Sequence, residues 1–288
     1  MKKISRILLP VDFSDHGAGA ATYAGMLAKH FGARIILLHV NPLFIPGLAL
    51  PREFSGPLDV GWVTAFEAQR RRDLDSYQIA PLHGISLDRV VVTGDPAHCI
   101  VEQAHRENVD LIVMPTRGYG RFRRFLLGSV AAKVLDDANC PVWTGSHLEG
   151  SNSTGRITSV LCAIDNGPAT ERVLHWAWGF AREFQAALTV LHVVSKLETP
   201  DDFLAAEAVT QRDKEAQSTV RCFLTKAGIC ADILIEKGEP STVVARTAEH
   251  VHANVTVIGR SSKTGGLGRL RPHVYSIIRE SPCPVVSI

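Results

Sequence analysis

A glycine-bearing segment in the first half of the chain has the composition of an anion-binding loop. Gly118 and Gly128 are separated by nine residues, and Ser129 follows at the expected start of a helix. Glycine lets backbone N–H groups approach an anion closely because it has no Cβ. A helix N-terminus adds unpaired N–H donors and the positive end of the helix dipole. With the Ser129 hydroxyl as a further donor, the segment is predicted to hold a triphosphate.

Arginine is abundant in the same segment, at Arg117, Arg121, Arg123 and Arg124. These side chains raise the local positive potential. Arginines on a surface loop are more often solvated than individually essential, so none of the four is assigned a specific role.

Strands and helices alternate around this loop. Apolar runs predict strands at 4–11, 35–40, 89–93, 109–114 and 141–144, with helical patterns between them. This alternation is typical of a doubly wound parallel sheet with right-handed crossovers. Ligands of such sheets bind beyond the carboxyl ends of the strands. The first strand ends at Asp12 and the fourth at Met114, so a site is expected there. Alone, Asp12 also fits a turn or cap residue.

The same pattern occurs twice. Asp12 and Asp165 lie 153 positions apart, as do His39 and His192, whereas Cys140 and Cys283 lie 143 apart. We therefore expect an α/β chain of two tandem doubly wound parallel five-stranded sheets. Domains are predicted at 1–146 and 156–288, with a Gly- and Ser-rich linker near 145–155. The first copy holds extra residues near 41–57, whose prolines and apolar side chains indicate a packed loop.

Several motifs together resemble the universal stress protein family. They are Val11-Asp12-Phe13-Ser14, Leu38-His39-Val40, Gly118-x9-Gly128-Ser129-Val130 and Cys140-Pro141-Val142. The nucleotide-binding members carry Gly-x2-Gly-x9-Gly-(Ser/Thr) after the fourth strand. The resemblance covers nearly the whole chain and implies an adenine-nucleotide alpha-hydrolase-like, Rossmann-like fold.

The resemblance also implies roles for single residues. Asp12 and the backbone at Val40 would meet the adenine and ribose. Five further positions would line the ribose and phosphates: Met114, Gly118, Gly128, Ser129 and Val130. ATP would bind with a divalent ion, Mg²⁺, bridging the phosphates, because few carboxylates lie near the loop.

The two copies depart from the family pattern to different degrees. Pro115 replaces the first glycine of the first copy and removes one N–H donor. In the second copy Gly259 is kept, but Ser262, Pro272 and His273 replace the remaining glycines and the serine. ATP binding is therefore expected in the first copy and not, by the same mode, in the second.

Composition limits the other functions. The net charge of +2 does not indicate a nucleic-acid partner, and no apolar run reaches the length of a membrane span. Six cysteines without a CxxC pair fit a cytoplasmic protein whose cysteines are small buried residues. The His and Cys spacings predict no metal-ligand set. His39 and His192 are interpreted as packed strand residues.

Three functions stay open at this stage. The favoured one is an ATP-binding regulatory protein of the stress response that is not an enzyme and acts on an unknown protein partner. The alternatives are a slow ATPase and an interaction scaffold without nucleotide, which Pro115 favours. The last strands would leave exposed edges, so the two copies are expected to pair as an intramolecular pseudo-dimer, with a homodimer of chains also possible.

Overall fold

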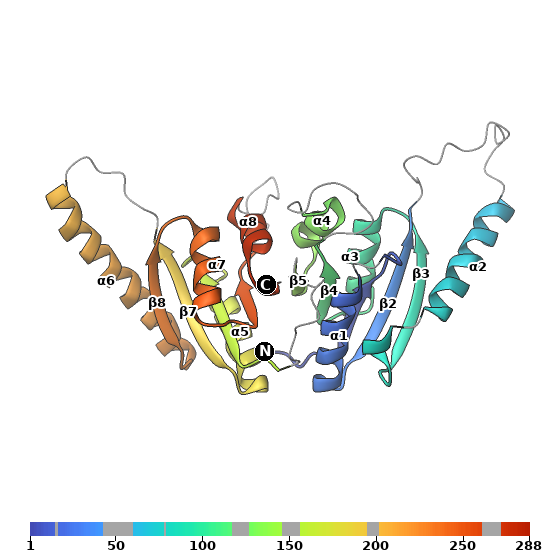
Figure 1. Ribbon diagram of the computed structural model, residues 1–288, viewed down its shortest axis with the longest axis horizontal. Helices are drawn as coiled ribbons and strands as arrows, with labels where there is room; N and C mark the ends of the chain where they lie inside the picture. Colours follow the sequence, from blue (N-terminus) through green and yellow to red (C-terminus); the bar gives the residue numbers. More distant parts are fainter. Residues whose placement is uncertain are drawn as a thin grey trace. The chain divides into compact units, whose positions relative to one another are not determined.

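The computed structural model describes residues 1–14, 17–42, 60–77, 79–116, 127–145, 156–194, 202–260 and 272–288 (Figure 1). The chain forms two compact units. One holds Lys3–Arg123 and Gly128–Cys140, and the other holds Pro141–Ile288 together with Met1–Lys2.

The first copy of the repeat alternates strands and helices, as its apolar pattern predicts. Its elements are β1 (Arg6–Pro10), α1 (Gly17–Phe31), β2 (Arg34–Asn41), α2 (Val60–Ser76), a 3₁₀ turn η1 (Ala80–Leu82), β3 (Leu87–Thr93), α3 (Pro96–Arg106), β4 (Leu111–Pro115), α4 (Ser129–Asp137) and β5 (Val142–Gly145).

The second copy repeats this order without a counterpart of η1 in its described part. Its elements are β6 (Ser159–Ile164), α5 (Thr170–Phe184), β7 (Ala187–Val194), α6 (Asp202–Ala227), β8 (Asp232–Lys237), α7 (Pro240–His250), β9 (Val255–Ile258), α8 (Pro272–Glu280) and β10 (Val285–Ser287). The predicted fold class is confirmed: each copy contributes five strands to a doubly wound α/β arrangement.

Neighbouring strands within each unit are parallel, with one exception. The order is β3-β2-β1-β4 in the first unit and β5-β10-β9-β6-β7-β8 in the second. The exception is β5, which pairs antiparallel with β10 and sets Trp143 opposite Val286. The last strand of the first copy therefore covers the edge that the last strand of the second copy would otherwise expose. In sequence β5 precedes residue 146, but its contacts put it in the second unit.

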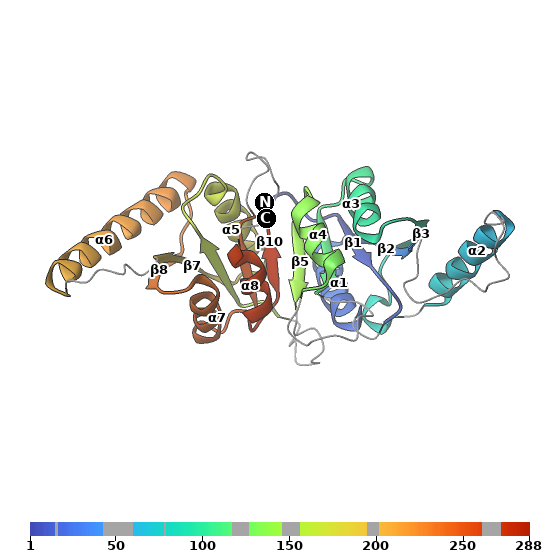
Figure 2. The same cartoon turned by 90° about the horizontal axis from the view of Figure 1, so that it is seen from above.

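Helices cover both faces of the strands in each unit. Figure 2 shows α5 on one side of the strands of the second unit, with α7 and α8 on the other. The central strands are buried on both faces and read as continuous apolar runs, such as Ile7–Leu9 and Ile35–Leu38. Helix α1 buries a face that includes Ala21, Ala24 and Phe31.

Local signals at the helix ends have the expected effect. Pro96 is in the first turn of α3, and the Asp95 side chain caps that helix by accepting from the His98 N–H at 2.9 Å. Gly32 follows α1 with a φ of +66°, a conformation that glycine adopts without strain. None of the helices in the described ranges combines the length and apolar character needed to cross a membrane.

The interpretation of the cysteines as buried is correct for some and wrong for others. Cys162 and Cys283 are buried, and burial raises the pKa of the Cys162 thiol to about 12. Cys222 and Cys230 are exposed. Cys222 lies on α6 and Cys230 follows it, so solvent-facing positions of one long helix and its exit account for the difference.

Candidate functional site

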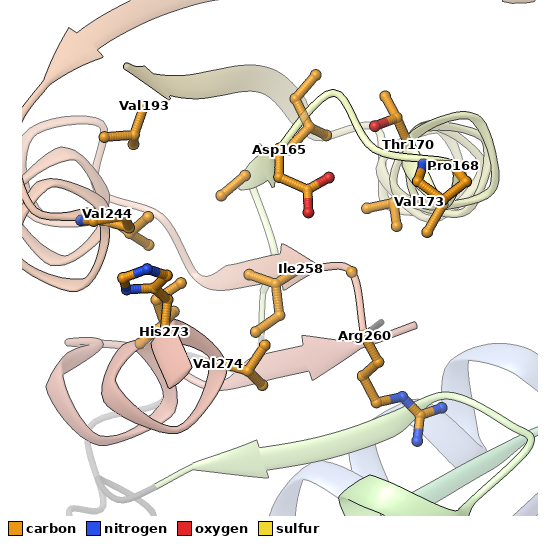
Figure 3. Close-up of a pocket in the computed structure, with 16 residues that line it drawn as sticks. Asp165, Pro168, Thr170, Val173, Val193, Val244, Ile258, Arg260, His273 and Val274 are labelled. Atoms are coloured by element: carbon orange, nitrogen blue, oxygen red, sulfur yellow. The ribbon is translucent and has the colours of Figure 1, made fainter. Parts of the chain in front are cut away.

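The second copy contains a cavity beyond the carboxyl ends of its central strands (Figure 3). Its volume is about 330 Å³. Asp165 stands at its strand-end wall, Val193 comes from β7, and Ile258 and Gly259 come from the end of β9. His273 on α8 closes another side. Central strand ends are where parallel α/β sheets bind ligands.

The repeat relates this cavity to the residues predicted in the first copy. Helices α1 and α5 each have 15 residues and start 153 positions apart. The offset between the copies is 153 positions up to the second strand, 144 around the fourth strand and 143 at the last helix. At these offsets, five lining residues of the second copy correspond to predicted site residues of the first: Asp165 to Asp12, Val193 to Val40, Ile258 to Met114, Gly259 to Pro115, and His273 to Val130. The prediction therefore selected positions that, in the other copy, line one cavity. Gly118 and the four loop arginines lie outside the described residues.

Asp12 is held in a tight turn just after β1. Its Oδ1 accepts from the Ser14 hydroxyl at 2.6 Å and from the Ser14 N–H at 3.0 Å. The residue between them, Phe13, has a φ of +61°, which is unusual for a bulky side chain. The Ser14 hydroxyl proton is therefore donated to Asp12. The turn fixes the carboxylate at the strand end, so the turn and binding interpretations of Asp12 are compatible.

The second copy builds the same turn from different residues. Asp165 Oδ1 accepts from the Gly167 N–H at 2.8 Å, and Asn166 has a φ of +57°. Asparagine adopts this left-handed conformation more readily than phenylalanine. Both copies therefore orient a strand-end carboxylate in the same way, although only the aspartate is shared.

His39 supports the turn rather than providing a reactive group. Its Nδ1 lies 2.8 Å from the Val11 carbonyl, and its ring packs on Phe13 with centroids 4.4 Å apart. Burial lowers the pKa of His39 and the nearby Arg70 lowers it further, against the opposing effects of Val11 and Asp12. The imidazole is consequently neutral near pH 7 and anchors the end of β1. His192 makes the corresponding contact to the Ile164 carbonyl at 3.0 Å.

The two ends of the predicted phosphate loop meet between β4 and α4. The Gly128 N–H donates to the Thr116 carbonyl at 2.8 Å. Gly128 is the N-cap of α4, and as a glycine it has no side chain that could accept from the first turn of the helix. The Gly128 N–H therefore closes the loop, and the lining of the phosphates by Gly128 stays a prediction. The helix donors that point outward are those of the first turn, beginning with Ser129 and Val130.

The equivalent helix of the second copy starts with a proline. Ala138 N–H bonds the Val134 carbonyl and Ser281 N–H bonds the Ile277 carbonyl, which fixes the offset of these helices at 143. Pro272 therefore corresponds to Ser129, one position from the sequence-based alignment. A proline at this position has no N–H to offer a phosphate.

A carboxylate also stands beside this helix start in the second copy. His273 Nδ1 lies 3.3 Å from Glu239 Oε1. The Ser241 hydroxyl, which donates to Glu239 at 2.5 Å, lowers the pKa of the Glu239 carboxyl, so Glu239 is ionised near pH 7. The first copy has Asp95 at the same repeat position, and the His98 N–H likewise lowers the pKa of its carboxyl, so this negative charge does not by itself distinguish the two copies.

Sequence reasoning missed the helix residues of the cavity wall. Val173 on α5 and Val244 on α7 line the cavity, and their counterparts are Ala20 and Ile100. These apolar positions look like ordinary core residues in the sequence. Only the repeat offsets, applied once the cavity is known, select them.

A doubly wound α/β protein with a ligand cavity at its strand ends is the class that this fold and site define. The universal stress protein family model matches residues 3–144 and 157–288. The chain therefore belongs to the universal stress protein family, with two copies of the family unit.

Relatives agree with this assignment. A universal stress protein of Methanocaldococcus jannaschii is 34% identical over 141 residues, which cover 48% of this chain and 79% of the relative. One from Mycolicibacterium smegmatis is 24% identical over 301 residues, covering 98% of this chain and 96% of that protein. The crystal structure of a universal stress protein from Archaeoglobus fulgidus has the same fold, with a TM-score of 0.70, 24% identity and coverage of 99% and 96%.

Proposed function

We propose that this universal stress protein binds ATP in its first copy and acts as a regulatory protein of the stress response rather than as an enzyme. One observation carries the proposal: the start of α4 is held against the end of β4 by the Gly128–Thr116 hydrogen bond. The first-turn N–H groups of α4 then face the strand end where the turn holds Asp12.

The proposed contacts follow from these positions. Asp12 and the backbone at Val40 meet the ribose and the adenine, and Met114 packs against the base and ribose. Ser129 and Val130 donate to the phosphates, and Gly118 is a further predicted phosphate-lining residue that lies outside the described residues. Pro115 contributes its ring and no donor, which weakens phosphate binding without removing the α4 donors.

A magnesium ion fits this arrangement only as a partner of the phosphates. The described residues contain no group of three or more His, Cys, Asp or Glu side chains that could hold a metal. Mg²⁺ keeps several waters and is commonly held through substrate phosphates. In the proposed site it neutralises phosphate charge, while the protein supplies N–H and hydroxyl donors.

The second copy serves as a structural partner in this proposal. Its α8 starts at Pro272, which offers no N–H to a phosphate, so we expect that it does not bind ATP in the same mode. The antiparallel pairing of β5 with β10 supports an intramolecular pseudo-dimer of domains 1–146 and 156–288. We place the protein in the cytoplasm and expect its loop conformation, set by ATP, to select a protein partner.

Thermal unfolding with and without nucleotide tests the proposal. ATP with Mg²⁺ at about 100 times its Kd should add roughly 2.7 kcal/mol to the unfolding free energy. A Ser129→Ala variant should unfold at the same temperature without nucleotide and gain less from it. If ATP does not raise the unfolding temperature of the folded wild type, the scaffold function replaces this proposal.

Hydrolysis distinguishes the regulatory protein from the slow ATPase. The chain carries neither a Ser-Gly-Gly-x-Asp-Ser nor a His-x-Gly-His motif, and His39 is packed against Phe13. Incubation with radiolabelled ATP should therefore leave the nucleotide intact. Phosphate release that is lost in the Ser129→Ala variant would establish the ATPase.

A further inference from the structure

We propose that the cavity of the second copy is a separate site for an uncharged, nucleoside-sized ligand that carries hydrogen-bond donors and no phosphate. The proposal goes beyond ATP binding by the first copy and does not require it. It depends on the polar groups of the cavity, its narrowing relative to the first copy, and the charges at its rim.

An unpartnered hydroxyl lines the cavity. Thr170 is 2% exposed, and its Oγ1 has no hydrogen-bond partner. In Figure 3 this oxygen turns toward the cavity, as does the carboxylate of Asp165. A buried hydroxyl without a partner costs free energy in the ligand-free protein, and a ligand group that bonds it recovers that cost. Asp165 adds a strong acceptor for ligand hydroxyl or amine groups.

Much of the remaining wall is apolar. Val193 and Ile258 come from the strands, Val173 from α5 and Val244 from α7. These side chains surround the polar pair in Figure 3. Cavities with apolar walls and a few placed polar groups are typical of small-molecule sites.

At most lining positions where the two copies differ in side-chain size, the second copy has the larger residue. Larger residues stand where the first copy has small ones: Thr170 for Gly17, Val173 for Ala20, Arg260 for Thr116, His273 for Val130, and Val274 for Ala131. In the first copy, a Cβ built on Gly17 meets no atom within 4 Å. Four lining positions change in the opposite direction: Ala163 for Pro10, Ala169 for His16, Val244 for Ile100, and Gly259 for Pro115. The cavity thus accommodates less than a full nucleotide.

The charges at the rim exclude phosphates. Glu239 holds His273 at 3.3 Å, and the side chain of Arg260 extends away from Asp165 and Thr170 in Figure 3. Pro272 provides no N–H at the start of α8. A phosphate beside Asp165 would therefore face a carboxylate, with the Arg260 side chain directed away and no N–H from Pro272, whereas an uncharged base and sugar would use Asp165 and Thr170.

Adenosine is the probe that tests this site, in the full chain with ATP and Mg²⁺ at saturation. Calorimetry should show one adenosine site per chain. Thr170→Val keeps the shape but removes the hydroxyl, and should weaken adenosine binding about tenfold while leaving the ligand-free unfolding free energy unchanged or higher. Gly259→Leu should abolish binding, because a Cβ there already meets Val173 Cγ2 at 3.1 Å. Gly17→Ala, at the first-copy position equivalent to Thr170, is the matched control and should leave adenosine binding unchanged.

Three results would overturn the proposal. They are no adenosine binding, adenosine binding that neither Thr170→Val nor Gly259→Leu alters, and a second ATP site that Gly259→Leu removes. Failure of the ATP proposal is distinguishable: the chain would then bind no ATP, while the adenosine heat sensitive to Thr170→Val would persist.

Discussion

The Gly128 N–H donates to the Thr116 carbonyl at 2.8 Å, and eleven residues lie between the two in the sequence. This bond joins the residue that directly follows β4 to the N-cap of α4. In the proposed site, the first donors of α4 and Asp12 bind opposite ends of the same nucleotide. The geometry of the proposed phosphate site thus depends on one backbone contact as much as on the glycine spacing.

Replacing Pro115 tests the cost of its missing N–H. Pro115→Gly restores the donor found at Gly259 in the second copy and should tighten ATP binding up to about tenfold. The same change should lower the unfolding free energy by roughly 1 kcal/mol, because glycine gains chain entropy in the unfolded state. Calorimetry and urea denaturation measure the two effects. Pro115→Ala also restores the N–H but keeps a Cβ, so it separates the effect of the donor from the effect of removing the side chain. Equal ATP affinity in the wild type and both variants would contradict the assignment.

The turn at Asp12 predicts a difference between its amide and alanine variants. Asp12→Asn keeps an acceptor for Ser14 and should fold with nearly wild-type stability, whereas Asp12→Ala should lose about 1 kcal/mol. Both should weaken ATP binding, since the carboxylate charge is lost in each. Asp165→Asn is the matched control in the second copy. An effect of Asp165→Asn on ATP affinity equal to that of Asp12→Asn would show that the two sites are not distinguished.

Much of this site is readable from the sequence because it depends on local signals. The strand ends at Asp12 and Met114, the proline in the first turn of α3 and the helix start at Ser129 all follow from residue type and spacing. The loop closure by Thr116 does not, because a backbone carbonyl carries no sequence signature. The partner of β5 is likewise set by a contact more than a hundred residues away, at Val286.

The misassigned residues have physical explanations of the same kind. Residue type alone predicts burial of Cys222 and Cys230, yet Cys222 lies on an exposed side of α6 and Cys230 lies in the chain just after that helix. The correspondence of Pro272 with Ser129 required the helix hydrogen bonds, since the loops before α4 and α8 differ in length by one residue. Phe13 in the turn has a positive φ, which its residue type does not predict, because this conformation is typical of glycine.

Buried His39 predicts a loss of stability in mild acid. Burial holds the folded-state pKa of His39 below its ordinary value of 6.5, so the unfolded chain takes up the proton first as the pH falls. The stability from neutral His39 is complete above pH 6.5 and declines below it, by at most about 1.4 kcal/mol per pH unit, until the lowered pKa is passed. Urea denaturation at pH 7.5 and 5.5 measures the decline. His39→Gln should reduce the difference between the two pH values; an unchanged difference would assign it to other groups.

Close packing of α1 against η1 makes Gly25 intolerant of a side chain. A Cβ at Gly25 would lie 2.5 Å from the Pro81 carbonyl oxygen, so Gly25→Ala should cost roughly 1–3 kcal/mol of unfolding free energy. Gly17→Ala is the control in the same helix, where a Cβ meets nothing within 4 Å, and should change stability by less than about 0.5 kcal/mol. Equal losses in the two variants, measured by urea denaturation, would contradict the packing described for α1.

Calorimetric titration of ATP with Mg²⁺ into the full chain tests the central claim most directly. We predict one site per chain in the wild type, loss of that site in a Gly128→Ala/Ser129→Ala variant, and an unchanged site in a Pro272→Ala/His273→Ala variant. No binding by the folded wild type would contradict the account, and so would a site that only the second-copy variant removes.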